Sequence, residues 1–277
     1  MLARGFDVVR TRTKGRAQKV RRLLVAALAF LACASALVVI DWARASARAE
    51  HTWEHDLSLS ANEMTTETAT AVHFKGAIDV NGFPVDSAWE ITPPVRFSTD
   101  WKGLNADPER ETEVRLLWTQ DTLYLRFDAR YRVLTVFPDS DSGGRRNQLW
   151  ERDVCETFLQ PDASQLRRYK EIEVAPNGFW IDLDIGAGPR RDLQSGMRRR
   201  VDVDSAAKKW RAVLALPMKS LTASFDPAIA WRVNFFRVEG PSEPRFYSSW
   251  QATRTPQPNF HVPEVFGRLV FAQAPLK

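Results

Sequence analysis

Cysteine is scarce in this sequence: Cys33 and Cys155 are the only two among 277 residues. Two thiols are too few for a disulfide framework, and for any zinc or iron–sulfur site held by four thiolates. The fold must therefore be stabilised by packing, and a composition with 44% hydrophobic residues can form a sizeable core. Because Cys155 lies among strand-forming residues, we expect it to be a buried, unpaired thiol.

The larger part of the chain also lacks an excess of positive charge. Residues 1–22 hold eight Lys and Arg against one acidic residue, and this segment accounts for the formal net charge of +5. From Glu50 onward there are 29 basic and 32 acidic side chains, a net charge of −3. Nucleic-acid phosphates attract basic surfaces, so this charge distribution argues against a nucleic-acid partner.

Only one stretch is long and apolar: residues 23–40 carry no charge and follow the basic segment. A basic segment, an apolar stretch and the small residues at 43–49 are typical of a secretory signal peptide, but eighteen apolar residues also approach the ~20 that span a bilayer. Residues 1–49 are therefore predicted to be a signal peptide or a signal anchor. Under the positive-inside rule, the rest of the chain is periplasmic or secreted, and an uncleaved segment would anchor it to the inner membrane.

No later stretch has the period of a long amphipathic helix. Short runs rich in β-branched and aromatic residues alternate in polarity, and Leu123, Leu125 and Phe127 share one predicted strand face. One helical turn is expected around Met218–Leu221. The predicted strands are Glu113–Trp118, Thr122–Tyr131, Asp153–Leu159, Tyr169–Val174, Gly178–Ile185, Arg198–Val203, Trp210–Leu216, Ala230–Val238, Arg245–Trp250 and Gly267–Phe271.

The spacing of these strands predicts an all-β fold. Ten short strands separated by turn-forming residues are typical of an antiparallel β-sandwich of the jelly-roll or immunoglobulin-like kind. Residues 50–71 are polar and poor in large apolar side chains, so they are expected to form a tether. We therefore predict one sandwich domain over residues 72–273.

Common catalytic motifs are absent, including G-x-S-x-G, the P-loop and H-E-x-x-H. Glu151, Asp153 and Glu156 could suggest the paired carboxylates of a glycosidase. In a regular strand, however, Glu156 lies on the face opposite to Glu151 and Asp153, and nothing fixes a catalytic separation. We expect a protein without enzymatic activity.

An acidic turn is the one candidate for a metal site. Asp139 and Asp141 precede two glycines, as in the first half of a calcium loop, but the twelfth position of an EF-hand counted from Asp139 is Trp150, not Glu. The EF-hand motif therefore fails. Two interpretations of the turn stay open: a looser structural calcium site at Asp139 and Asp141, and a solvated turn without an ion. We expect that the protein requires no cofactor.

Nine short fragments, in order between Val72 and Phe271, resemble the family 9 carbohydrate-binding modules and their stand-alone bacterial relatives. Each fragment is weak alone, but their order over one domain is fairly specific. The fragments are Asp86–Trp89, Val114–Trp118, Leu123–Leu125, Trp150–Asp153, Glu156–Phe158, Tyr169–Val174, Pro176–Gly178, Trp231–Arg237 and Phe266–Gly267.

The resemblance implies a β-sandwich that holds a sugar between two aromatic side chains, with structural calcium in some members. Trp150 corresponds to the first aromatic residue, and Glu156 to a carboxylate that contacts sugar hydroxyls. The second aromatic residue corresponds to Phe260, where the characterised sugar binders have Trp. Phenylalanine keeps an aromatic face that can stack on a pyranose.

Other positions of the resemblance differ from the sugar binders. Two further polar contacts correspond to Glu173 and Ala175, and Ala175 has no side-chain hydrogen bond to offer. Arg237 and Gln257 complete the set of candidate carbohydrate-binding residues. The polar residues decide which sugar fits, so the sequence does not name it.

The predicted function is non-catalytic carbohydrate binding outside the cytoplasm, in the service of carbohydrate catabolism, with a mono- or oligosaccharide as the partner. Two other functions stay open. One is a periplasmic interaction or scaffold module that keeps the fold without the sugar. The other is a haem-binding redox sandwich. Its axial ligands would be a Met or a His, and Met197 and His261 are the candidates expected near loops.

Export can be tested with a reporter. Alkaline phosphatase fused after Lys277 should be active in cells, because the predicted leader carries the fused enzyme out of the cytoplasm. A reporter that works only in the cytoplasm, fused at the same point, should be inactive. The opposite pair of results would refute the leader assignment.

Overall fold

The computed structural model describes residues 67–141 and 143–274. The predicted leader, and the tether up to residue 66, lie outside these residues. Within the described residues, no helix is both long enough and apolar enough to span a bilayer.

The described chain is built mainly of strands. They are β1 (Thr68–His73), β2 (Val95–Phe97), β3 (Thr112–Trp118), β4 (Thr122–Arg130), β5 (Val154–Gln160), β6 (Tyr169–Val174), β7 (Trp180–Ile185), β8 (Arg191–Asp192), β9 (Arg198–Asp204), β10 (Lys209–Pro217), β11 (Trp231–Glu239), β12 (Phe246–Ser249) and β13 (Gly267–Ala272). The short helices are η1 (Asp86–Ile91), η2 (Pro108–Arg110), η3 (Leu149–Glu151), α2 (Met218–Leu221) and η4 (Pro263–Val265).

The ten predicted strands and the helical turn α2 are all present, with ends shifted by at most two residues. Strands β1, β2 and β8 were not expected. Strand β1 begins at Thr68, four residues before the start predicted for the domain at Val72. Its alternation of small and β-branched residues is short, and polar residues precede it, so composition alone does not separate it from the tether.

The strands form one 13-stranded sheet in the order β8-β7-β6-β5-β11-β13-β1-β3-β4-β10-β9, with β12 on β11 and β2 on β3. The prediction of a purely antiparallel fold is wrong. Strand β1 runs parallel to β13, with Ala71 opposite Phe271, and parallel to β3, with Ala71 opposite Leu116. The sheet is therefore mixed. Parallel neighbours need no hairpin between them, so the local turn signals used for the prediction do not report them.

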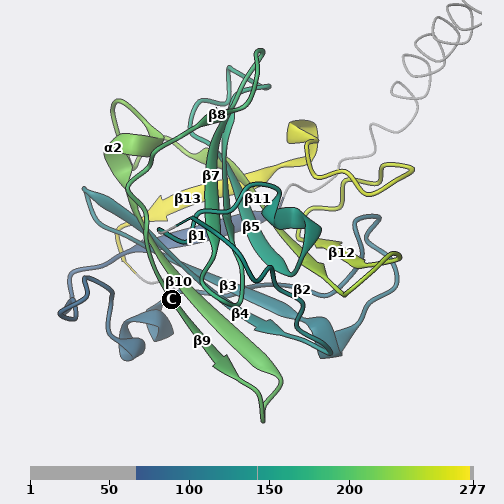
Figure 1. The fold of residues 1–277 in the computed structure, drawn as a ribbon. Helices are drawn as coiled ribbons and strands as arrows, with labels where there is room; N and C mark the ends of the chain where they lie inside the picture. Colours follow the sequence, from purple (N-terminus) through teal and green to yellow (C-terminus); the bar gives the residue numbers. More distant parts are fainter. Residues whose placement is uncertain (1–66, 142, 275–277) are drawn as a thin grey trace, which may run out of the picture. The chain divides into compact units, whose positions relative to one another are not determined.

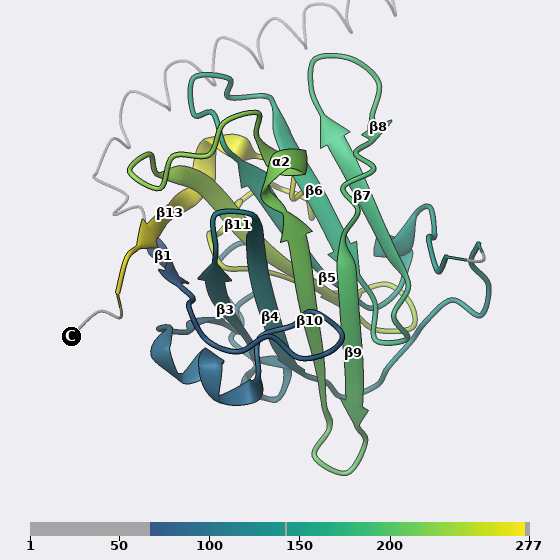
Figure 2. The same ribbon diagram turned by 90° about the vertical axis from the view of Figure 1, so that its left-hand side faces the viewer.

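The sheet curls so that two groups of strands face each other (Figures 1 and 2). One group is β3, β4, β10 and β9, and the other is β7, β6, β5 and β11. Their facing side chains make one core, to which Leu125 and Leu214 contribute from the first group and Ile172 and Phe235 from the second. The inward face predicted for Leu123, Leu125 and Phe127 is confirmed.

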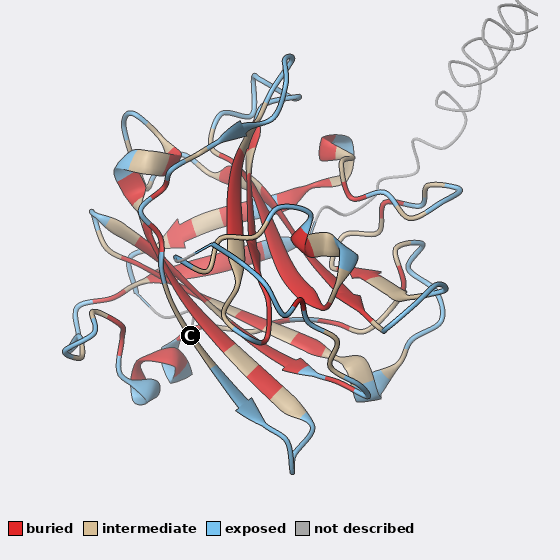
Figure 3. Ribbon diagram, in the orientation of Figure 1, coloured by how far each residue is buried: buried red, intermediate tan, exposed pale blue. Residues whose placement is uncertain are grey.

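The group containing β5, β6 and β11 is covered on its outer face as well. Every residue of β5 is buried, and Figure 3 shows its ribbon red along its length. Phe158, Phe236 and Phe266 belong to a second apolar cluster on this outer face, and loops on either side complete it. Residues 154, 156 and 158 of β5 therefore lie under loops, while residues 155 and 159 lie in the main core.

Cys155 is a free, fully buried thiol, as expected. Burial raises its pKa to about 12. In a Cys33→Ser variant, Cys155 should react with a thiol reagent only after unfolding, because the thiolate is disfavoured and the sulfur is out of reach. Titration before and after adding denaturant measures this. Rapid reaction of the native variant would show that this strand face is open to solvent.

Candidate functional site

A pocket of about 390 Å³ opens on the outer face of β5, β6 and β11. The strands supply its floor, and segments between strands supply its rim. The lining residues are Trp150, Glu151, Glu156, Glu171, Arg190, Val238, Arg245, Tyr247, Pro258, Asn259, Phe260 and His261. Three of the residues predicted for carbohydrate binding, Trp150, Glu156 and Phe260, are thus brought together from distant parts of the sequence.

The two aromatic residues of the pocket differ in exposure. Trp150 sits in the short helix η3. The neighbouring Leu149 is buried and anchors this helix, whereas Trp150 is half-buried and partly exposed to solvent. Phe260 is only 9% exposed and stacks on Phe236, with ring centroids 4.3 Å apart and planes at 16°. Phe260 is therefore a wall that continues the apolar cluster, and Trp150 belongs to the rim.

A guanidinium covers part of Trp150. Arg190, just before β8, lies over the indole ring at 5.1 Å, a favourable cation–π arrangement. Arg245 donates a hydrogen bond to the carbonyl of Trp150 at 2.8 Å and another to the hydroxyl of Tyr247 at 2.7 Å. Two arginines thus hold the rim of the pocket around the tryptophan.

Arg190 also fixes the protonation of His261. Its Nη2 lies 2.7 Å from His261 Nε2, and the hydroxyl of Tyr169 lies 2.7 Å from His261 Nδ1. A guanidinium can only donate, so Nε2 must accept, and the proton of the neutral ring lies on Nδ1 and is donated to Tyr169. Burial and then the charge of Arg190 lower the pKa of His261 to about 4.

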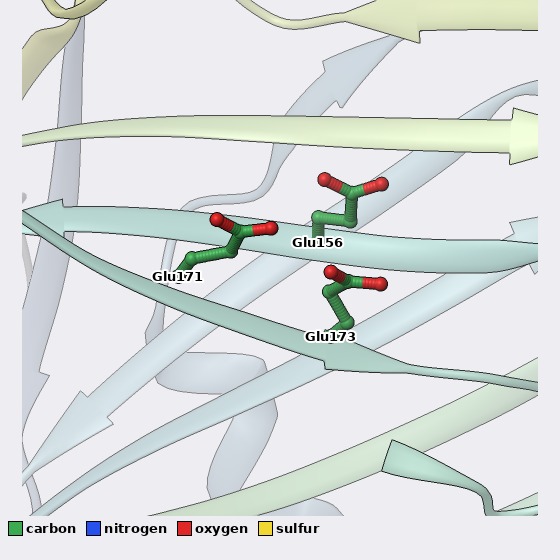
Figure 4. Close-up of side chains that lie close together, drawn as sticks. All are labelled: Glu156, Glu171 and Glu173. Atoms are coloured by element: carbon green, nitrogen blue, oxygen red, sulfur yellow. The ribbon is translucent and has the colours of Figure 1, made fainter. Parts of the chain in front are cut away.

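Three glutamates lie together at the floor. Glu156 of β5 pairs across the strands with Glu173 of β6, and Glu171 is two residues away on the same face of β6 (Figure 4). All three are at most 2% exposed. Burial first, and the neighbouring carboxylates second, raise the pKa of Glu156 and of Glu173 well above the usual range. Burial also raises the pKa of Glu171.

Two predicted binding residues lie away from the pocket. Arg237 of β11 is next to Phe236 in sequence, so its side chain points to the opposite face of the sheet, where it is fully buried and lies over Trp210 at 5.3 Å. It donates to the carbonyl of Val238 at 2.6 Å. Gln257 is exposed and does not line the pocket, and its carbonyl accepts from Thr255 at 2.7 Å.

The acidic turn offers little to a calcium ion. Oδ1 of Asp141 already accepts the backbone N–H groups of Gly143 at 2.9 Å and Arg145 at 2.7 Å. Asp139 faces Arg146 at 3.7 Å, and its side chain is 74% exposed. Among the described residues, neither aspartate belongs to a group of three acidic, histidine or cysteine side chains close enough to share one ion.

The haem alternative has no matching geometry. Met197 is buried in the main core, whereas His261 stacks on Phe158 of the outer cluster. The two side chains therefore belong to different faces of the sheet, and both ring nitrogens of His261 already have partners.

Asp153, one of the carboxylates weighed for a glycosidase, accepts a hydrogen bond from the backbone N–H of Gly240 and does not line the pocket.

Sequence reasoning missed Glu171, Arg190, Arg245, Tyr247 and His261 as members of one site. Glu171 could have been found, because it shares a strand face with Glu173 by simple alternation. The other four come from segments whose positions depend on the loops that cover the outer face. No local spacing in the sequence marks them.

The comparisons with known proteins agree with this geometry. The family model described as carbohydrate family 9 binding domain-like matches residues 78–274. The chain belongs to this family. The resemblance noted from the nine fragments is thereby confirmed, and the curled, mostly β, mixed sheet is the family 9 type of fold.

Three relatives of this family 9 domain place it among known proteins. An "Extracellular protein" of Arthroderma benhamiae is 23% identical over 181 residues, which cover 59% of this chain and 80% of the relative. A Bacteroides uniformis ATCC 8492 structure, of a protein with an inferred carbohydrate-binding role, has a TM-score of 0.61 at 16% identity and covers 75% of this chain and 100% of its own. A family 9 module from Caldicellulosiruptor kristjanssonii, in complex with cellotriose, has a TM-score of 0.52 at 15% identity. The match covers 75% of this chain and 94% of that module. At these identities, the two structures establish the fold alone.

The ring of His261 provides a test of the pocket's electrostatics. Nitrogen NMR of the ring should show the neutral Nδ1–H form at neutral pH, and protonation only near pH 4. An Arg190→Ala variant should titrate closer to the ordinary value of about 6.5, because it removes a cation next to Nε2.

The sign of the effect on stability follows from the same pKa. The pKa of His261 is lowered in the folded state, so below about pH 6.5 the unfolded chain binds a proton that the folded protein does not. The contribution of His261 to folding stability is therefore complete above about pH 6.5 and is lost as the pH falls towards 4. A ring that titrates near 6.5 in the parent protein would contradict the contact with Arg190.

Proposed function

We propose that this protein is a non-catalytic saccharide-binding protein that works outside the cytoplasm, with its sugar held in the pocket next to Trp150. The observation that carries the proposal is the meeting of Trp150, Glu156 and Phe260 in one pocket of about 390 Å³. That volume falls within the range of about 300–1,000 Å³ usual for small-molecule sites. The extracellular relative supports the proposed location.

The chemistry of the pocket suits a polyhydroxylated ring. The C–H faces of a pyranose stack on aromatic rings, and Trp150, Tyr247 and Phe260 offer such surfaces. Sugar hydroxyls can donate to the carboxylates of Glu156 and Glu171 and accept from Arg190 and Arg245. A pocket that holds both donors and acceptors matches the dual character of a hydroxyl group.

The sugar contacts of this chain are proposed to rest on charged residues. Ala175 offers no polar group, and Phe260 is nearly buried, so these two positions add little to recognition. Arg190 lies over the indole of Trp150, so a sugar that stacks there must displace the guanidinium or bind beside it. We therefore expect the identity of the sugar to depend on Arg190.

Calorimetry with a panel of mono- and oligosaccharides that includes cellotriose tests the proposal. Trp150→Ala should weaken binding about tenfold or more, because aromatic stacking contributes ~1 kcal/mol or more per ring. Its melting temperature should change little, since Trp150 is only half-buried. A tryptophan packed in the core would instead cost about 3–5 kcal/mol of stability on truncation.

Trp180→Ala is the matched control. Trp180 is also half-buried and also lies beneath an arginine, Arg199, at 5.2 Å, but it does not line the pocket. This variant should bind sugar as the parent does. If no saccharide gives heat with the parent, and Trp150→Ala lowers the melting temperature steeply, the proposal fails and a protein-interaction module becomes the better explanation.

A further inference from the structure

The glutamate cluster at the pocket floor has the geometry of an ion site. Glu156, Glu171 and Glu173 each offer a carboxylate oxygen, and these oxygens lie within 4.8 Å of one another. Figure 4 shows the three carboxylates grouped over the paired strands β5 and β6. The three come from two paired strands, so the backbone register fixes their spacing.

The cluster also lacks hydrogen-bond donors. Glu173 is fully buried, and neither of its carboxylate oxygens has a donor among the described residues. Oε1 of Glu156 and Oε2 of Glu171 are likewise without one. Glu173 and Glu171 are close enough to share a hydrogen bond, which requires a proton on one of the two carboxyl groups. Buried polar atoms in proteins are rarely left in this state.

The nearby arginines do not fill this role. Arg190 faces all three carboxylates and Arg245 faces Glu156. The hydrogen bonds of Arg190 and Arg245 in the structure, however, go elsewhere: Arg190 donates to His261, and Arg245 donates to the carbonyl of Trp150, to Tyr247 and to the carboxylate of Glu243. Among the described residues, the two guanidiniums therefore give the three carboxylates no hydrogen bond.

We propose that Glu156, Glu171 and Glu173 together bind one hard divalent cation at the floor of the pocket. Carboxylate oxygens are the ligands such ions prefer, and calcium binds them at about 2.3–2.6 Å. Two oxygens on one calcium ion can thus be at most about 4.6–5.2 Å apart, and the cluster meets this limit. This site is distinct from the turn at Asp139 and Asp141.

The proposed ion is placed to act on whatever the pocket holds. Glu156 and Glu171 line the pocket as well as belonging to the cluster, whereas Glu173 lies beneath them. An ion held by all three would face the pocket with part of its coordination sphere open. The ion titration needs no saccharide, so its result is independent of the proposed sugar binding.

The test is calorimetry and thermal unfolding of the chelator-treated protein with CaCl₂, MgCl₂ and MnCl₂ in turn. At least one ion should bind with one-to-one stoichiometry and raise the melting temperature. Glu173→Gln should weaken that binding tenfold or more and abolish the rise. Because the amide removes a buried negative charge, this variant should fold at least as well as the parent without ion.

Two further variants complete the design. Glu171→Gln, at the pocket-lining edge of the cluster, should lose ion binding in the same way. The double variant Asp139→Asn, Asp141→Asn should keep it. The proposal is overturned if no ion binds at millimolar concentration, if both glutamine variants bind as the parent does, or if only the double variant loses binding.

Discussion

Burial of both faces of strands β5, β6 and β11 is the constraint on which the site depends. A strand with one open face can place its polar residues in water, but these strands have the main core on one side and loops on the other. Glu156, Glu171 and Glu173 therefore lie where an ionised carboxylate is costly without a partner. The pocket is the break in the covering loops through which two of them can reach a ligand.

The same constraint explains why Arg237 and Glu156 lie on different faces of the sheet although their strands are paired. Glu156 is opposite Phe236, and Arg237 is opposite Cys155, so alternation sends Arg237 into the main core. There it lies 3.4 Å from Glu239 and over the ring of Trp210, which offset the burial of its charge. One step along β11, from Phe236 to Arg237, thus separates the face that carries the pocket from the face that packs in the main core.

Much of the fold could be predicted from the sequence, because alternation and turns are local. The ten strands, the helical turn α2 and the buried Cys155 follow from such signals. The parallel pairing of β1 does not, since its partners β13 and β3 are joined to it by long connections. For the site, the resemblance brought in Trp150, Glu156 and Phe260, whereas Arg190 and His261 meet only through loop packing.

The rim arginines make recognition in this pocket different from stacking between two open aromatic walls. One face of the Phe260 ring stacks on Phe236, and Arg190 lies over the ring of Trp150. The aromatic surface that a ligand can contact is therefore reduced. What remains is a pocket with carboxylates below and guanidiniums around its edge. In such a place, charge and hydrogen-bond geometry contribute more to selectivity than ring area, because a buried polar group left unpaired is penalised. In the proposed site, the glutamates at the floor would therefore restrict which ligands fit, since two of them line the pocket and are at most 2% exposed.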